Sequence, residues 1–176
     1  MTTQALVVYE SMFGNTADVA REIAAGLATR GSVDLLEVHE APSPPDEAYD
    51  LVVVGGPTHA FSMSRPSTRE DAQRQGADAA VDQGVREWMD GLAAGSHHPR
   101  LASFDTRVSK VRRLPGSAAR RADRIGRRLG YRTACPPESF YVADISGPLV
   151  EGERHRAREW GAHLADLCER QRRLTR

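Results

Sequence analysis

Residues 9–16, Tyr-Glu-Ser-Met-Phe-Gly-Asn-Thr, mark the point where a strand pattern gives way to a helical one. The run at 5–9, Ala-Leu-Val-Val-Tyr, is apolar and β-rich, as in a strand buried on both faces. From Ala17 onward the apolar residues recur at helical spacing. We therefore predict a strand-to-helix turn at 11–16. Such turns direct backbone N–H groups and the positive end of the helix dipole toward an anion.

The turn carries hydroxyl and amide side chains but no cation. Ser11, Asn15 and Thr16 can hydrogen-bond an anion, and Gly14 allows the backbone to approach it closely. A phosphate bound here would be neutralised by amides and hydroxyls. The spacing matches neither the P-loop, Gly-x-x-x-x-Gly-Lys-Ser/Thr, nor the dinucleotide motif, Gly-x-Gly-x-x-Gly. On these residues alone, an ordinary capped helix start is an equally good interpretation.

Two motifs resemble the flavin-binding loops of flavodoxins. Ser11, Gly14 and Thr16 match their phosphate loop, roughly Ser/Thr-x-Thr-Gly-x-Thr, with Phe13 in place of the middle threonine. Related flavodoxin-like quinone reductases also carry an aromatic residue before the glycine. The stretch at 57–61, Pro-Thr-His-Ala-Phe, follows an apolar strand that ends in glycine and is similar to the segment that lines the isoalloxazine ring. The likeness extends, more weakly, over most of the chain and is to the short-chain type.

The rest of the chain alternates strand and helix patterns, which predicts an α/β fold with a parallel sheet. Strands are expected at 5–9, 33–38, 51–55, 101–105 and 139–143, and helices at about 18–29, 85–92, 118–129 and 153–173. Gly31 is expected to end the first helix in a left-handed conformation. The resemblance implies a flavodoxin-like, doubly wound, five-stranded parallel sheet of order 2-1-3-4-5 with helices on both faces. We expect residues 1–176 to form a single domain.

The resemblance also implies that FMN binds noncovalently to three loops at the carboxyl ends of the strands. The residues expected to bind it are Ser11, Met12, Phe13, Gly14, Asn15 and Thr16 in the first loop, Pro57, Thr58, His59, Ala60 and Phe61 in the second, and Asp105, Thr106 and Arg107 in the third. His59 or Phe61 would lie against the flavin. The alternative is that Phe61 fills the loop and His59 is solvated.

Arg107 has two interpretations. A guanidinium at the N1/O2 edge of the flavin would favour the anionic reduced form and raise the redox potential. Otherwise Arg107 faces water or pairs with Asp105. We assign no catalytic residue and no metal ligand, because no carboxylates are paired and the adjacent His97 and His98 have no partner at ligand spacing.

The charge of the chain is unevenly distributed. Residues 1–88 hold 6 basic and 14 acidic side chains, a net charge of −8, whereas residues 89–176 hold 18 and 10, a net charge of +8. From 107 to 132 there are ten basic residues and one acid, Asp123. This segment is either a solvated face or a docking surface for an acidic redox partner. Nucleic acid is disfavoured because no groove-reading motif or interleaved aromatic pattern accompanies the charge.

Composition and motifs restrict the function classes. With 40% hydrophobic and 27% charged residues, no membrane-length apolar run and no secretory signal, the sequence is typical of a cytoplasmic protein. Cys135 and Cys168 are expected to be reduced thiols. A receiver domain is excluded because no phospho-acceptor aspartate follows the third strand, where Gly55 and Gly56 stand.

Three functions follow from the resemblance. The first is electron transfer through FMN to a redox partner protein or a small electron acceptor. The second is an FMN-dependent NAD(P)H:quinone-type reductase of the same fold. The third is a binding module that has kept the fold and lost the flavin. No oligomeric state is predicted.

Overall fold

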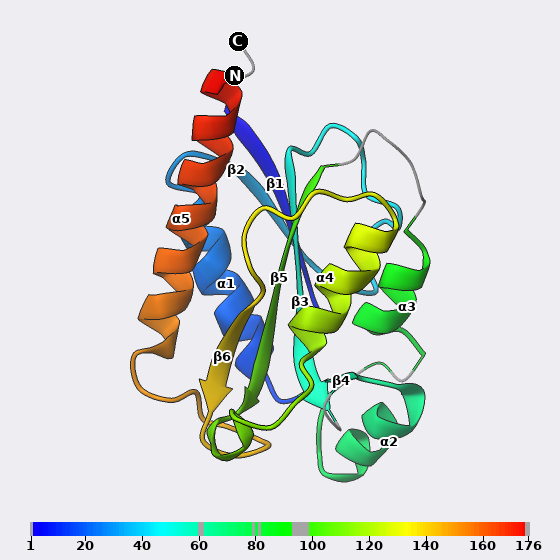
Figure 1. Ribbon diagram of the computed structural model, residues 1–176. Helices are drawn as coiled ribbons and strands as arrows, with labels where there is room; N and C mark the ends of the chain where they lie inside the picture. Colours follow the sequence, from blue (N-terminus) through cyan, green and yellow to red (C-terminus); the bar gives the residue numbers. More distant parts are fainter. Residues whose placement is uncertain (1, 60–61, 79, 81, 93–98, 175–176) are drawn as a thin grey trace.

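The computed structural model describes residues 2–59, 62–78, 80, 82–92 and 99–174. Six strands are present: β1 (Thr3–Tyr9), β2 (Gly31–Glu37), β3 (Leu51–His59), β4 (Ser62–Met63), β5 (Arg100–Val108) and β6 (Glu138–Val142). The helices are α1 (Asn15–Leu27), α2 (Pro66–Arg74), α3 (Val85–Asp90), α4 (Ala118–Arg128) and α5 (Glu153–Leu174), and a short 3-10 turn, η1 (Ser109–Val111), follows β5. Figure 1 shows these elements in sequence colours.

The sheet has the topology predicted from the sequence. Five strands run parallel in the order β2-β1-β3-β5-β6, which is 2-1-3-4-5 when only these strands are counted. The short strand β4 was not predicted and pairs antiparallel with the end of β3. Strand order reverses beside β1, which lies between β2 and β3. Ligands of open α/β sheets bind at such a switch point, outside the carboxyl ends of the strands.

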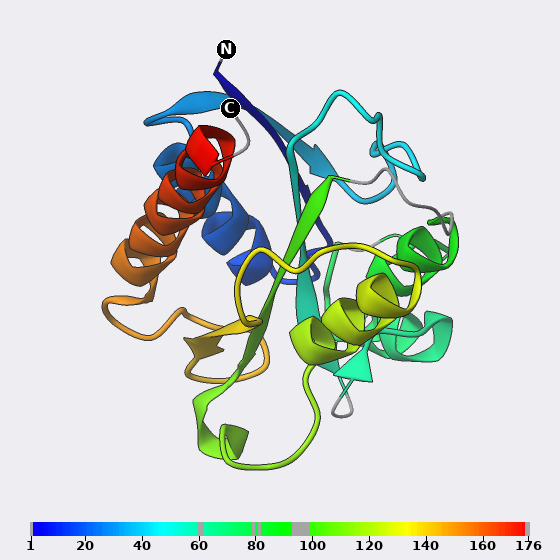
Figure 2. The same cartoon turned by 45° about the horizontal axis from the view of Figure 1, so that its top comes forward.

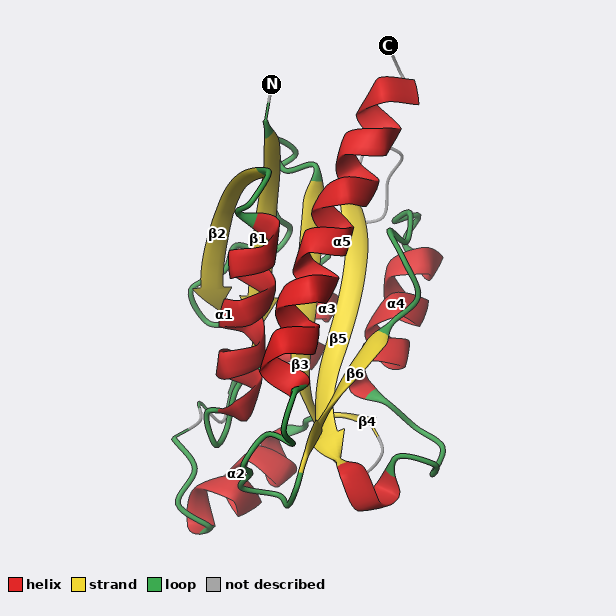
Figure 3. Cartoon of the chain, turned by 90° about the vertical axis from the view of Figure 1, so that its left-hand side faces the viewer, coloured by secondary structure: helices red, strands yellow, loops and turns green. Residues whose placement is uncertain are grey.

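Helices cover both faces of the sheet, as Figures 1 and 3 show. Alternate residues of β1 and β3 point to opposite faces, so Val7 and Val53 pack against α1 and α5 while Val8 and Val54 pack toward α3 and α4. All four are at most 1% exposed. Burial on both faces explains why these strands read as continuous apolar runs. Figure 2 shows the twisted sheet between the two helical layers.

Two glycines allow α1 and α5 to pack closely. A Cβ on Gly26 would lie 2.1 Å from the carbonyl oxygen of Arg158, and one on Gly161 would lie 2.2 Å from that of Ile23. Backbone atoms cannot move aside cheaply, so both positions require glycine. The predicted left-handed conformation of Gly31 is wrong. Gly31 is the first residue of β2 and is not among the positive-φ glycines.

The remaining elements agree with the sequence apart from their boundaries. Ser117 caps α4, because its hydroxyl accepts a hydrogen bond from the Arg120 amide at 3.1 Å. Cys135 and Cys168 are free thiols. Within the described ranges, no helix has the length and apolar character that crossing a membrane requires.

Candidate functional site: a cavity at the carboxyl ends of the strands

The turn between β1 and α1 is held open by a glycine. Gly14 is the N-cap residue of α1 and has φ 85°, a left-handed conformation that side chains with a Cβ rarely adopt. A Cβ there would meet nothing within 4 Å, so the backbone conformation, and not a close contact, requires glycine. No side chain caps the helix at this residue. Within the described residues, the first two amides of α1, those of Asn15 and Thr16, therefore stay without an acceptor.

A run of backbone amides in this turn has no acceptor. Among the described residues, no hydrogen bond is donated by the N–H groups of 12–16, whereas the next amide, that of Ala17, donates to Ser11 Oγ at 3.2 Å. The Asp18 amide begins the helical pattern by donating to the Gly14 carbonyl at 3.0 Å. Unbonded backbone donors at and just before a helix N-terminus are an arrangement that favours an anion.

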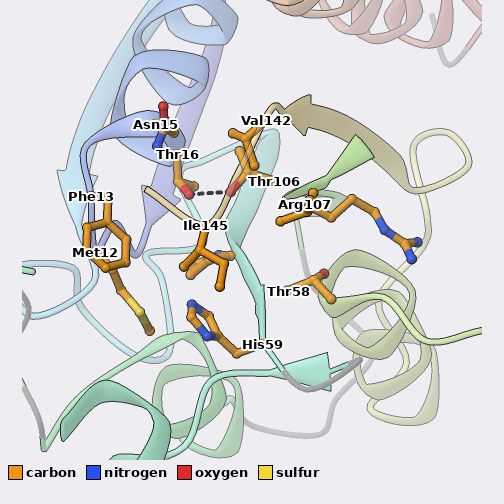
Figure 4. Close-up of a pocket in the computed structure, with 12 residues that line it drawn as sticks. Met12, Phe13, Asn15, Thr16, Thr58, His59, Thr106, Arg107, Val142 and Ile145 are labelled. Atoms are coloured by element: carbon orange, nitrogen blue, oxygen red, sulfur yellow. Dashed lines mark hydrogen bonds between the residues drawn. The ribbon is translucent and has the colours of Figure 1, made fainter. Parts of the chain in front are cut away.

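The turn opens onto a cavity of about 190 Å³. Figure 4 shows the residues that line it, which come from the ends of β1, β3, β5 and β6 and from the start of α1: Met12, Phe13, Asn15, Thr16, Pro57, Thr58, His59, Thr106, Arg107, Val108, Val142 and Ile145. Nine of these were predicted from the sequence. The structure thus brings the three predicted segments to one place, although they are separated by 40 or more residues in the chain.

Two of the predicted hydroxyls meet at the back of the cavity. Thr16 Oγ1 on α1 and Thr106 Oγ1 on β5 lie 2.7 Å apart and share a hydrogen bond, drawn as a dashed line in Figure 4. Both side chains are buried. One hydroxyl donates to the other, so the pair still has a proton for a ligand oxygen. Ser11 and Gly14 do not line the cavity, and the Ser11 hydroxyl accepts from within the turn itself.

The second predicted segment is strand and not loop. β3 continues through Pro57 and Thr58 to His59, where it pairs with β4. The Thr58 hydroxyl points away from the ligand side, because it donates to Asp105 at 2.8 Å and accepts from the Ala118 amide at 2.9 Å. Ala60 and Phe61 lie outside the described residues, so the predicted contact of Phe61 stays a prediction.

His59 contributes an uncharged ring to the cavity. Burial lowers the pKa of its imidazole below the ordinary value of 6.5, so the ring is neutral at pH 7. Figure 4 shows it pointing toward Ile145, with Met12 nearby. A neutral ring between two aliphatic side chains is a surface suited to a planar, largely apolar group.

Asp105 does not belong to the cavity. It is fully buried within β5, and its Oδ2 atom accepts hydrogen bonds from the Thr58 hydroxyl, the Ser117 hydroxyl and the Ala119 amide. The prediction that a loop begins at Asp105 is wrong, because β5 continues to Val108. Through these hydrogen bonds, Asp105 links the end of β3 to the first turn of α4 and so stabilises one wall of the site.

Arg107 lines the cavity with its stem but directs its charge elsewhere. Its Nη2 atom donates to the carbonyls of Val111 at 2.9 Å and Leu114 at 3.1 Å. Figure 4 shows the guanidinium turned away from the threonine pair. It neither faces water nor pairs with Asp105, so the second interpretation of Arg107 is wrong, while contact with a flavin stays a prediction. In this structure Arg107 holds the loop after β5, because its guanidinium donates to carbonyls at both ends of the turn at 111–114.

The sequence analysis missed the contribution of β6. Val142 at the end of β6 and Ile145 in the following loop both line the cavity, and Ile145 is 56% exposed. Asn15 ties this loop to the first one, because its Nδ2 donates to the Ser146 carbonyl at 3.1 Å. The signal was present in the sequence: β6 is parallel to β5, so its carboxyl end reaches the same edge of the sheet.

A buried polar network that was not predicted lies beside the first loop. Glu10, directly after β1, accepts from the Ser64 hydroxyl at 2.6 Å and from the Val85 amide at 2.9 Å. Arg69 of α2 donates to Ser64 and pairs with Glu87 at 3.0 Å. Burial raises the pKa of Glu10 above its ordinary value. The network joins the end of β1 to α2, β4 and α3.

The site is therefore a turn with unbonded backbone amides next to a partly apolar cavity, at the switch point of a doubly wound sheet. Among the described residues, no group of three or more His, Cys, Asp or Glu side chains could hold a metal ion. These features are those of a doubly wound α/β protein with a cavity at the carboxyl edge of its sheet.

Comparison with known proteins shows that the chain is similar to flavodoxins in part of its sequence and in its fold. Residues 7–91 match the family model described as flavodoxin. The fold is similar to that of a Streptococcus pneumonia TIGR4 flavodoxin, at 16% identity and a TM-score of 0.67, over 93% of this chain and 99% of that one. It is also similar to oxidised Flavodoxin 2 from Bacillus cereus, at 18% identity and a TM-score of 0.65 over 93% and 99%.

A flavodoxin from the domain Archaea matches at 16% identity and a TM-score of 0.64, over 95% of this chain and 99% of that one. No curated protein sequence matches the chain. The sequence match to the flavodoxin family model covers 7–91, just under half of the chain, and the similarity to solved flavodoxins shows a flavodoxin-like fold over nearly the whole chain.

Proposed function

We propose that this protein binds FMN noncovalently in the cavity and transfers electrons through it. The observation that carries the proposal is the run of free amides at 12–16, which opens onto the cavity at the start of α1. A phosphate dianion is the ligand group that such a cradle favours when no cation is nearby. Flavin mononucleotide combines this phosphate with a planar ring.

The residues present fit that ligand. The amides of 12–16 and the Thr16 and Thr106 hydroxyls would hold the phosphate and the polar chain. Met12, His59 and Ile145 would contact the ring, and they would exclude water from part of it. The bound flavin would supply the redox chemistry, while the protein supplies binding, orientation and the surrounding polarity.

The position of Arg107 bears on the potential. Its guanidinium is bound to the Val111 and Leu114 carbonyls and not directed at the ligand side of the cavity. A fixed positive charge at the ring edge is therefore not part of the proposal. The neutral His59 and the aliphatic side chains give the ring a low-polarity surrounding, in which a charge on the ring is disfavoured.

The test is to mix purified protein with excess FMN, remove free flavin by gel filtration and assay the flavin released on denaturation. Near one FMN per chain supports the proposal, and protein that stays colourless contradicts it and favours the flavin-free binding module. The loaded protein is then mixed with NADH or NADPH and a quinone. Steady turnover would show a reductase, whereas reduction only by a partner protein or dithionite would show a carrier.

A further inference from the structure

One face of the protein carries cations without ion-pair partners. Within the described residues, no salt bridge is formed by seven exposed side chains of η1, α4 and their flanking loops: Lys110, Arg112, Arg113, Arg120, Arg124, Arg128 and Arg132. We call these seven residues the α4 basic face. Only Arg127 in this segment has an acidic partner, Asp123, at 2.9 Å.

Three arginines at the start of α5, by contrast, form ion pairs. Arg154 pairs with Asp18, Arg158 with Glu22 at 2.8 Å, and Arg156 with both Glu138 and Glu153. Figure 3 shows α5 beside α1, which supplies two of these acids. Acidic side chains thus neutralise these three arginines of α5. Within the described residues, none neutralises the α4 basic face.

The unpaired charges lie along one stripe of α4. Arg120, Arg124 and Arg128 follow at intervals of four residues and therefore face the same way on the helix. Like charges at this spacing destabilise a helix. An acidic surface that packs against the stripe offsets this repulsion. A bound acidic partner would therefore stabilise α4.

The α4 basic face adjoins the cavity. The loop that bears Lys110, Arg112 and Arg113 follows directly after Val108, which lines the cavity. Arg107 fixes this loop through the Val111 and Leu114 carbonyls. Figure 1 shows the loop and the start of α4 at the same end of the molecule as the tip of β6.

Exposed aliphatic side chains accompany the charges at this end. Leu114 is 47% exposed within the basic loop, and Ile145 is 56% exposed at the cavity. Protein interfaces commonly combine such apolar contacts with surrounding arginines. Single-stranded nucleic acid would need aromatic side chains for base stacking. From 109 to 132 the one aromatic residue is Tyr131, and it is buried.

We propose that the α4 basic face is the docking surface for an acidic protein, which would reach the cavity across Leu114 and Ile145. The docking rests on the charges and exposure alone. Only the statement that this partner exchanges electrons rests on the proposed function. Arginine suits the task, because its planar guanidinium binds carboxylates through two parallel hydrogen bonds.

The test uses fluorescently labelled poly-L-glutamate of about 20 residues as the carboxylate probe. Binding is measured by anisotropy with flavin-free and FMN-treated protein at low and at physiological ionic strength. The Arg120→Gln/Arg124→Gln/Arg128→Gln variant should bind about tenfold more weakly, because three exposed charge pairs together account for roughly one decade in Kd. Hydrogen exchange on the same complex should show slowing at 109–128.

The matched control is Arg74→Gln/Arg154→Gln/Arg170→Gln, which removes the same charge from other exposed positions. It should bind as the wild type does. The lysine triple Arg120→Lys/Arg124→Lys/Arg128→Lys should retain most of the binding, and thermal unfolding checks that each variant folds. Equal losses in the glutamine triple and its control would overturn the proposal. So would absence of binding at low salt, or tighter binding of an oligothymidylate of equal charge. Because flavin-free protein is included, these outcomes are independent of FMN binding.

Discussion

Replacing Asp105 tests whether this residue is structural, as its contacts indicate, or part of the ligand site. Asp105→Ala removes the acceptor of three buried donors: the Thr58 hydroxyl, the Ser117 hydroxyl and the Ala119 amide. Each buried donor left without an acceptor costs roughly 1–3 kcal/mol. Since the hydroxyls can rotate toward other acceptors, we expect the free energy of unfolding to fall by about 4 kcal/mol, near the low-to-middle part of the summed range.

The matched variant is Asp105→Asn, which keeps one acceptor oxygen and removes the charge. The free energy of unfolding of this variant should be about 1–2 kcal/mol below that of the wild type. This is the difference between a hydrogen bond to a charged acceptor near a helix N-terminus and one to a neutral acceptor. Urea unfolding of both variants and the wild type, with the slope of the transition compared, gives the numbers. A transition midpoint of Asp105→Ala equal to that of the wild type would refute this account of β3 and α4. Equal damage from Asn and Ala would show that charge, and not the acceptor, is what matters.

Three further predictions follow from other contacts. Arg107→Leu removes the donor to the carbonyls in the loop after β5. Hydrogen exchange at 109–116 should therefore accelerate, and the free energy of unfolding should fall by about 2 kcal/mol. Unchanged exchange would contradict this role of Arg107. Gly161→Ala places a Cβ against the Ile23 carbonyl and should cost about 2 kcal/mol in thermal or urea unfolding, and a neutral effect would show that the helices can separate. Burial raises the pKa of Glu10, so the native state holds its proton more tightly than the unfolded state. The unfolding free energy of the wild type, minus that of Glu10→Gln, should therefore decrease as pH rises from about 4.5 through the raised native pKa, and a flat difference would disprove the shift.

Much of the fold was predictable because its signals are local. The runs at 5–9 and 51–55 are continuously apolar, as is typical of central parallel strands that are buried on both faces. This pattern predicted the middle of the sheet. The change from strand to helical spacing around Gly14 located the strand-to-helix turn. The ends of β3 and β5 were not predictable, because Thr58 and Asp105 are polar and their hydrogen bonds join each other and the first turn of α4.

What the sequence could not supply were contacts between distant segments. Nothing near Arg107 indicates that its guanidinium turns to the Val111 and Leu114 carbonyls instead of the cavity. Glu10 and Arg69 lie 59 positions apart, and each reads as an ordinary charged residue until folding buries both. By contrast, the place of Ile145 at the cavity could have been inferred, because the predicted sheet already put β6 parallel to β5.

The central claim is that main-chain amides at the start of α1 bind a phosphate. It is tested most directly by titrating the flavin-free protein with FMN and with riboflavin, which carries the same ring without the phosphate, and following flavin fluorescence. We predict that FMN binds at least about 100-fold more tightly, since several charge-assisted hydrogen bonds depend on the phosphate. Equal affinity for the two flavins, or binding of neither, would contradict the account.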